Sequence, residues 1–188
     1  MGFLDALFGR SKQVQPNLDR LFALPSAAVT LQASAGFTPA GTGSVCFRAV
    51  EGQAFSSVAD EVTGLLESVG GDIDETRDDY GYTWVTSTQP PDRLDALVTD
   101  IHAVNSALEG AGFGPQLLCS LFGFTDSGGR RLALVYLYKR GTFFPFAPLG
   151  GQRRDNALEL QVRASVAADL PIEPELERWL ALWGAPGM

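Results

Sequence analysis

Short stretches of this chain alternate between apolar and polar residues, and others are almost continuously apolar. Strict alternation is typical of a strand that is covered on one face, and a dense apolar run is typical of a strand covered on both. On these patterns the chain is expected to form about five strands, at 44–50, 72–76, 82–88, 116–124 and 131–140. The last two are separated by a short turn and are expected to form a central, covered hairpin.

Other stretches place apolar residues three and four positions apart, which predicts amphipathic helices. The spacing predicts helices at 25–35, 57–69 and 92–109, and Pro174 at a first-turn position predicts a last helix. Residues 156–168 fit two structures. Alternation from Leu158 to Val166 favours a strand, whereas Asn156 and Glu159 at capping-box spacing favour a helix, which we prefer.

The order of these elements predicts the fold class. Adjacent strands joined by short turns, with helices between the hairpins, are typical of an α+β fold: an antiparallel sheet of about five strands with helices packed mainly on one face. Small secretion-chaperone folds have a similar order, which is an analogy of shape only. Residues 17–188 are expected to form a single domain, and residues 1–16 an amphipathic N-terminal segment followed by a linker.

Three phenylalanines beside basic residues form the first candidate site. Gly141, Pro145 and Pro148 predict a loop after the last strand, and loops lie on the surface. We therefore expect a basic-aromatic patch that binds a protein partner, with a second contact from the N-terminal segment through Phe3 and Leu7. Two other interpretations stay open, namely that the loop folds over the core or that it touches lipid. The patch consists of Lys139, Arg140, Phe143, Phe144 and Phe146.

A glycine-arginine turn before residue 156 forms the second candidate site. A helix that begins near Asn156 would direct free backbone N–H groups toward this turn, and arginine side chains bind phosphate or carboxylate. The turn is therefore a candidate for binding a small anion or an anionic lipid headgroup through Gly150, Gly151, Arg153 and Arg154. Alternatively, Asp155 caps the helix and the arginines pair with acidic groups of the protein itself.

Charge and cysteine content bear on which partners the protein binds and on where in the cell it lies. The net charge is −8, yet it is unevenly spread: residues 51–110 hold thirteen acidic side chains against two arginines, while residues 111–163 carry an excess of basic ones. Nucleic-acid binding is not expected from such a chain. Cys46 and Cys119 lie in apolar contexts and are expected to be two buried thiols. With no signal peptide and no membrane-spanning apolar run, a cytoplasmic protein is predicted.

Candidate catalytic residues are few. His102 is the single histidine, and Ser106 lies one helical turn later, but Asp95 is too far along the helix to orient the imidazole. The acidic residues at 72–79 lack the glycine and the closing glutamate of an EF-hand loop. Asn105 lies in an apolar stripe and is expected to tie its helix to a strand. We expect no catalytic residue, no metal site and no cofactor.

Several segments resemble the PspA-associated protein PspAB family, a bacterial family. The segments are MGFLDALFGR at the start, DDYGYTWV at 78–85, VTDIHAVNSALEGAGFGPQLLCSLFGF at 98–124, RRLALVYLYKRGTFFPFAPLGGQRRDNALELQ at 130–161, and WGAPG at 183–187. Together they cover nearly the whole chain, and the segment at 130–161 is the most specific. The resemblance implies a role in the phage shock response to envelope stress, and it brings no catalytic residues with it.

The partners that the resemblance implies are a phage shock protein A-type protein or a membrane-bound metalloprotease of the stress response. The function expected from sequence is therefore a non-enzymatic cytoplasmic adaptor that binds a protein partner. Contact with the inner face of the membrane and the oligomeric state stay open. The alternative function is the binding of an anionic ligand at Arg153 and Arg154.

Overall fold

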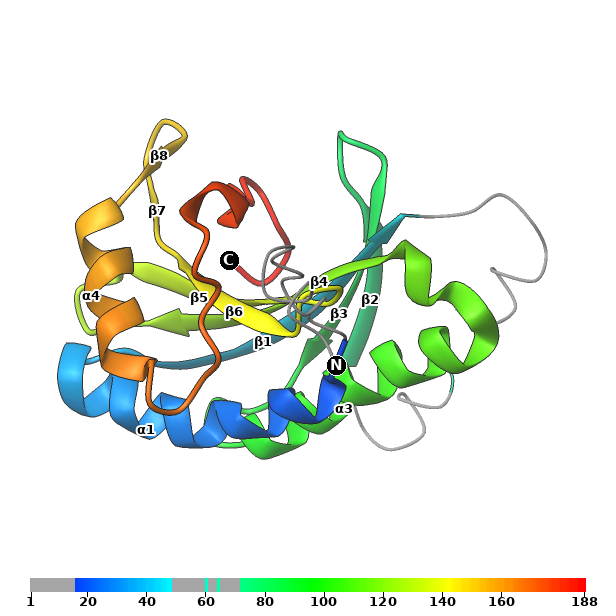
Figure 1. Cartoon of the computed structure of the whole chain (residues 1–188), viewed down its shortest axis with the longest axis horizontal. Coiled ribbons are helices and arrows are strands. Elements are labelled where there is room, and N and C mark those ends of the chain that lie inside the picture. Colours follow the sequence, from blue (N-terminus) through cyan, green and yellow to red (C-terminus); the bar gives the residue numbers. More distant parts are fainter. Residues whose placement is uncertain (1–15, 49–59, 61–63, 65–71) are drawn as a thin grey trace, which may run out of the picture.

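The computed structural model describes residues 16–48, 60, 64 and 72–188, and Figure 1 shows their arrangement. The predicted N-terminal segment and almost all of the predicted helix at 57–69 lie outside the described residues. The described helices are the 3₁₀ helix η1 (Leu18–Ala23), α1 (Leu24–Ala35), α3 (Leu94–Leu108) with the short turns η2 (Glu109–Phe113) and η3 (Gly114–Gln116), α4 (Asn156–Val166) and the 3₁₀ turn η4 (Leu176–Arg178).

Six strands form one antiparallel sheet in the order β2-β3-β1-β4-β5-β6. The α+β class is confirmed, with one strand more than the approximate five that were predicted. The strands are β1 (Thr38–Arg48), β2 (Asp72–Arg77), β3 (Tyr82–Thr88), β4 (Leu117–Thr125), β5 (Arg131–Leu137) and β6 (Thr142–Phe146), and a separate two-stranded ribbon pairs β7 (Pro148–Leu149) with β8 (Arg153–Arg154).

Helices α1, α3 and α4 pack on one face of the sheet and share a single hydrophobic core with it (Figure 1). Helix α1 ends where predicted, because Gly36 takes the left-handed conformation (φ 74°) and donates its N–H to Gln32. Asn105 of α3 is fully buried and donates to the hydroxyl of Ser120 on β4 at 2.8 Å. This amide ties the helix to the sheet, as predicted.

The ambiguous segment 156–168 is a helix over most of its length, which confirms the preferred prediction. Its N-cap is Asp155, whose side chain accepts the N–H of Leu158 at 3.0 Å. Glu159 is turned inward, where it accepts the backbone N–H of Ala147 at 2.8 Å. The cap is therefore Asp155, one residue before the Asn156 of the capping-box pattern, and Glu159 bonds outside its own helix.

The opposite face of the sheet is covered in part by the C-terminal segment, residues 171–188, drawn in red in Figure 1. The predicted last helix is wrong, because only the three residues of η4 are helical. The segment is held by the sheet instead: Ser44 donates to the carbonyl of Pro186 at 3.0 Å and Thr42 to that of Gly187 at 3.0 Å. Contacts with distant strands override the local helical pattern.

Candidate functional site

The basic-aromatic patch predicted at residues 139–146 is not an exposed surface. Phe143, Phe144 and Phe146 are each 0% exposed, and they lie in strand β6 rather than in a loop. Phe143 faces the helices, whereas the Phe144 ring lies 6.1 Å from Trp179 and the Phe146 ring 5.1 Å from Trp183. The prediction that these rings face outward to dock a partner is therefore wrong.

The physical reason is the C-terminal segment, which covers β6 from a point far along the sequence. Phe143 donates its N–H to Pro171 at 2.8 Å and accepts that of Glu173 at 2.7 Å, so the outer edge of β6 is paired at this residue. Pro145 is tolerated because it lies in the last strand of the sheet.

The remaining residues of the predicted partner-binding surface differ in their surroundings. Lys139 is exposed, but Arg140 is bound to Glu173 at 2.9 Å. Phe3 and Leu7 lie outside the described residues.

The arginines of the predicted anion site are largely used by the protein itself. Arg154 is paired with Glu159 at 2.9 Å, donates to the carbonyl of Trp179 and lies over the ring of Phe146. Arg153 donates to the carbonyl of Gly150 at 3.1 Å, beside Gly151 in the turn. Asp155 caps α4, as the alternative interpretation expected. Arg154 is therefore engaged within the protein, whereas Arg153 is exposed and bonds the turn through its Nε alone.

His102 has a carboxylate neighbour that the sequence did not reveal. The Ser106 hydroxyl lies 3.3 Å from His102 Nδ1, as the spacing suggested, and Asp19 of η1 lies 3.6 Å from His102 Nε2. The side chain of Asp19 is 88% exposed, so solvent screens this contact. A serine, a histidine and an acid are thus aligned on the surface, without a cavity among those described that they line.

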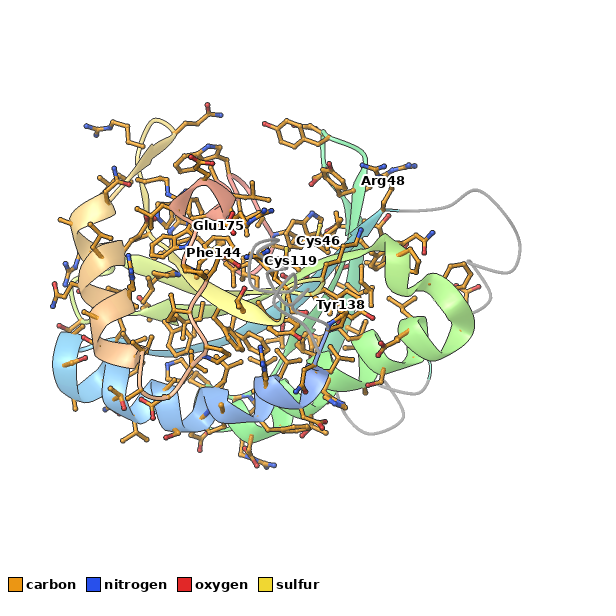
Figure 2. The ribbon with its side chains drawn as sticks, in the orientation of Figure 1. Cys46, Arg48, Cys119, Tyr138, Phe144 and Glu175 are labelled. Atoms are coloured by element: carbon orange, nitrogen blue, oxygen red, sulfur yellow. The ribbon has the colours of Figure 1, made fainter. Side chains whose placement is uncertain are left out.

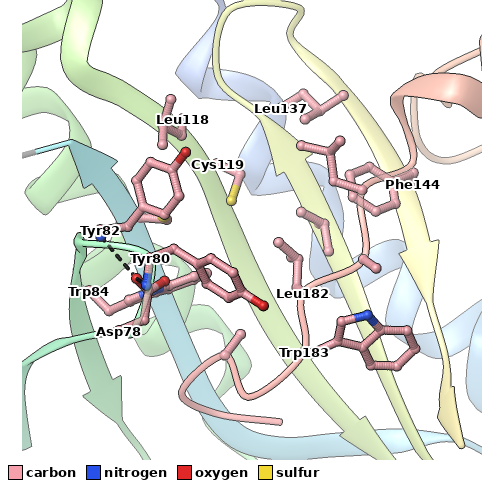
Figure 3. A pocket seen from close by; sticks show the side chains of 15 residues that line it. Asp78, Tyr80, Tyr82, Trp84, Leu118, Cys119, Leu137, Phe144, Leu182 and Trp183 are labelled. Carbon is pink, nitrogen blue, oxygen red and sulfur yellow. Dashed lines mark hydrogen bonds between the residues drawn. The ribbon is translucent and has the colours of Figure 1, made fainter. Parts of the chain in front are cut away.

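A pocket of about 530 Å³ opens on the sheet face that the helices leave free (Figure 3). Its floor is a row of residues that the register places opposite one another across four neighbouring strands, and cross-strand partners point to the same face. The row consists of Trp84 on β3, Cys46 on β1, Cys119 on β4 and Leu137 on β5.

Two segments form the walls of this pocket. On one side lies the β2–β3 turn, where Tyr80 is 72% exposed, and on the other lies the C-terminal segment, where Leu180 is 57% exposed. Figure 3 shows Tyr80 and Tyr82 on one side of the cavity and Leu182 and Trp183 on the other. Most of the lining is apolar or aromatic, which is typical of binding pockets.

The carboxylate of Asp78 holds the turn side of the pocket in place. Its oxygens accept the backbone N–H groups of Tyr80 at 3.0 Å and Tyr82 at 2.9 Å, and the indole N–H of Trp84 at 2.9 Å. Partial burial raises the pKa of Asp78, but these hydrogen bonds outweigh it and hold the pKa below its usual range. Asp78 is therefore ionised and already fully engaged within the protein.

Replacing Asp78 by alanine is expected to lower the free energy of unfolding by about 1–2 kcal/mol, because two N–H groups and an indole lose a charged acceptor. Trp84 should become mobile, which would change its fluorescence. Urea denaturation followed by tryptophan emission measures both effects. Asp79→Ala is the matched control, since Asp79 is exposed on the same turn. Equal stability of the two variants would show that Asp78 does not hold this wall.

Sequence reasoning missed this pocket, although one signal pointed toward it. Strands β4 and β5 are apolar at nearly every position, which predicts cover on both faces. The helices can cover only one of them. A second segment must therefore cover the other face of the sheet, and the tryptophans near the C-terminus are large apolar side chains that could form this cover.

The described part of the chain contains no cluster of three or more histidine, cysteine, aspartate or glutamate side chains that could hold a metal ion. Among the described helices, none is long and apolar enough to cross a bilayer. No curated protein and no solved structure is significantly similar to the chain. The family model of PspA associated protein B (PspAB) matches residues 1–187, and the chain therefore belongs to that family.

Proposed function

We propose that this protein is a non-enzymatic cytoplasmic binding protein that associates with a PspA-type protein, and that the pocket on the open face of the sheet receives an apolar side chain of that partner. The family description, which names PspA, supports the identity of the partner. The pocket between the β2–β3 turn and the C-terminal segment is the observation on which its location rests.

The chemistry of the pocket favours binding over catalysis. The carboxylate of Asp78, on the pocket wall, already accepts three hydrogen bonds from the protein and is therefore not available as a general acid or base. An apolar cavity with aromatic walls is instead suited to an aromatic or aliphatic anchor, since such anchors supply most of the binding energy at protein interfaces. Two thiols that are free in the structure also suit a reducing compartment such as the cytoplasm.

Charges beside the pocket define the partner further. The β2–β3 hairpin, which leads into the turn, carries five acidic side chains and Arg77 between 72 and 79. A partner segment with an apolar anchor and neighbouring lysine or arginine side chains would complement this surface, and opposite charges speed encounter. The metalloprotease that the resemblance also implies has no comparable support here and serves as the comparison in the binding experiment.

Leu180→Asp is expected to weaken association with the purified PspA-type protein of the same cell by about tenfold or more, because it places a charge at the rim of an apolar pocket. Val29→Asp is the matched control: Val29 is 69% exposed on α1, on the helix-covered side. Both variants should keep the wild-type circular dichroism and melting temperature. Titration calorimetry or a pull-down with each purified partner measures the effect.

Three results would count against the proposal in different ways. Equal binding by wild type and Leu180→Asp would move the interface away from the pocket. Failure of the wild type to bind the PspA-type protein, with binding to the metalloprotease, would replace the partner. A small molecule that native mass spectrometry finds bound to the freshly purified protein, and that Leu180→Asp lacks, would make the pocket a ligand site.

A further inference from the structure

Cys46 and Cys119 lie directly opposite each other on the antiparallel strands β1 and β4. Directly opposed residues in such a pair have Cα atoms about 4.5 or 5.5 Å apart. Either separation lies within the range of about 4.4–6.8 Å that disulfides require. Both side chains point to the same face of the sheet, and a hydrogen bond joins the two side chains. The two thiols are free, and Figure 2 labels both residues on the sheet.

These thiols are buried in the sheet, but they also border a cavity that opens to solvent. Cys46 is 3% exposed and Cys119 6%, yet both line the pocket, and Figure 3 shows the sulfur of Cys119 turned into it. The register of β1 and β4 shifts between Cys46 and Phe47, which leaves Leu118 as an extra residue beside the pair. Such a bulge interrupts the ladder locally and lets the two strands adjust to each other.

We propose that Cys46 and Cys119 are a site of reversible oxidation, at which a small hydroperoxide that enters the pocket converts the two thiols into an intramolecular disulfide. The Cys119 sulfur, on losing its proton, attacks one peroxide oxygen and the O–O bond breaks. The other oxygen leaves as hydroxide and takes up that proton to form water, and Cys119 becomes a sulfenic acid. The Cys46 sulfur then attacks the Cys119 sulfur and displaces the hydroxyl group as water. With hydrogen peroxide, the thiols lose two electrons and two protons in total, and the peroxide is reduced to two water molecules.

The order of attack follows from the position of the two sulfurs, and the surroundings of Cys46 agree with it. The hydrogen bond to Cys119, burial, and the negative charges of Cys119 and Asp78 all raise the pKa of Cys46. A raised pKa makes Cys46 the less reactive of the two thiols toward peroxide. The Cys119 sulfur is turned into the pocket, and Cys119 is the more exposed of the two residues, so Cys119 is the one that meets the peroxide and Cys46 is the one that closes the disulfide.

Intact mass measurement tests the proposal on the full chain. The protein is treated with hydrogen peroxide while folded, and then denatured in N-ethylmaleimide. We expect the treated protein to be lighter by two hydrogen atoms and to carry no maleimide, and to carry two maleimides after reduction with dithiothreitol. Because the chain has only two cysteines, no other thiol contributes. Oxidation of its methionines adds oxygen and is distinguished by mass.

Single-cysteine variants separate the two roles. Cys46→Ser should accumulate the Cys119 sulfenic acid, which dimedone traps, and Cys119→Ser should give about tenfold less adduct. Two maleimides on treated, folded wild type would overturn the proposal, and so would disulfide-linked dimers in place of the intramolecular product. The experiment uses no partner, so its failure would leave the proposed association with a PspA-type protein untouched.

Discussion

Replacing Glu173 by alanine is expected to lower the free energy of unfolding by about 3 kcal/mol, the lower end of the range for breaking a buried ion pair. Glu173 is 0% exposed and binds Arg140 through two hydrogen bonds of 2.9 and 3.0 Å, and it also accepts the hydroxyl of Thr142 at 2.7 Å. The lower end applies because the Arg140 side chain is 28% exposed and can turn to water once its partner is lost.

Glu175→Ala is the matched control for this variant. Glu175 also bonds Arg140, at 3.2 Å, but its side chain is 50% exposed, so its loss should change the free energy of unfolding by less than about 1 kcal/mol. Urea denaturation measures both variants. If Glu173→Ala were no less stable than Glu175→Ala, the C-terminal segment would not depend on this buried carboxylate for its attachment to the sheet.

The same carboxylate makes stability depend on pH in acid. Burial raises the pKa of Glu173, but the hydrogen bonds from Arg140, Thr142 and the N–H of Glu175 outweigh it and lower the pKa on folding. The unfolded carboxyl therefore takes up its proton first as pH falls. Wild type should lose stability below about pH 4.5, the ordinary pKa of this group. Glu173→Gln should lose less across the same interval, which thermal melts at several pH values would show.

Elements with a regular pattern could be predicted from the sequence. The helix α3 carries a complete apolar stripe, and the hairpin of β4 and β5 alternates or is apolar throughout, so local spacing alone identified them. The capping pattern around Asn156 led to the right choice for α4, although the actual cap is Asp155. In each case the information lies within a few residues.

The sixth strand and the C-terminal segment could not be predicted in this way. Strand β6 contains a proline and follows a glycine turn, so its sequence is that of a loop. It is a strand because it pairs with β5 over its whole length, and residues 171–173 add a bridge at Phe143. The segment after Pro174 has helical spacing at Leu176, Trp179 and Trp183, but its tryptophans bury more surface by lying on Phe144 and Phe146. Both structures are decided by contacts between residues that are far apart in the chain.

In the candidate site, too, some features follow from local sequence and others depend on contacts between distant residues. Cys46 and Cys119 were expected to be buried thiols, which is confirmed, but their position opposite each other depends on the register of β1 and β4. No local pattern gives that register. The pocket, in turn, exists because the C-terminal segment covers one end of the sheet and leaves the row around these cysteines open.

Phe144→Ala is expected to lower the free energy of unfolding by about 3–5 kcal/mol, the usual cost of removing a buried aromatic side chain. The ring is fully buried, opposes Val135 on β5 and stacks on Trp179 of the C-terminal segment. Phe144→Asp adds the desolvation of a carboxylate, and together these costs approach the whole stability of a typical domain, about 5–15 kcal/mol. We therefore expect Phe144→Asp to be unfolded, which circular dichroism and loss of a urea transition would show.

Tyr80→Ala is the control for Phe144→Ala, because Tyr80 is 72% exposed at the pocket wall and its truncation should change the free energy of unfolding by at most about 0.5 kcal/mol. The comparison also decides how a loss of partner binding is interpreted. Binding that is lost in Phe144→Asp together with the fold reflects unfolding, whereas binding that is lost in a folded Leu180→Asp reflects the interface. A Phe144→Ala variant that is as stable as wild type but fails to bind would instead mean that this ring contacts the partner directly, as the sequence alone had suggested.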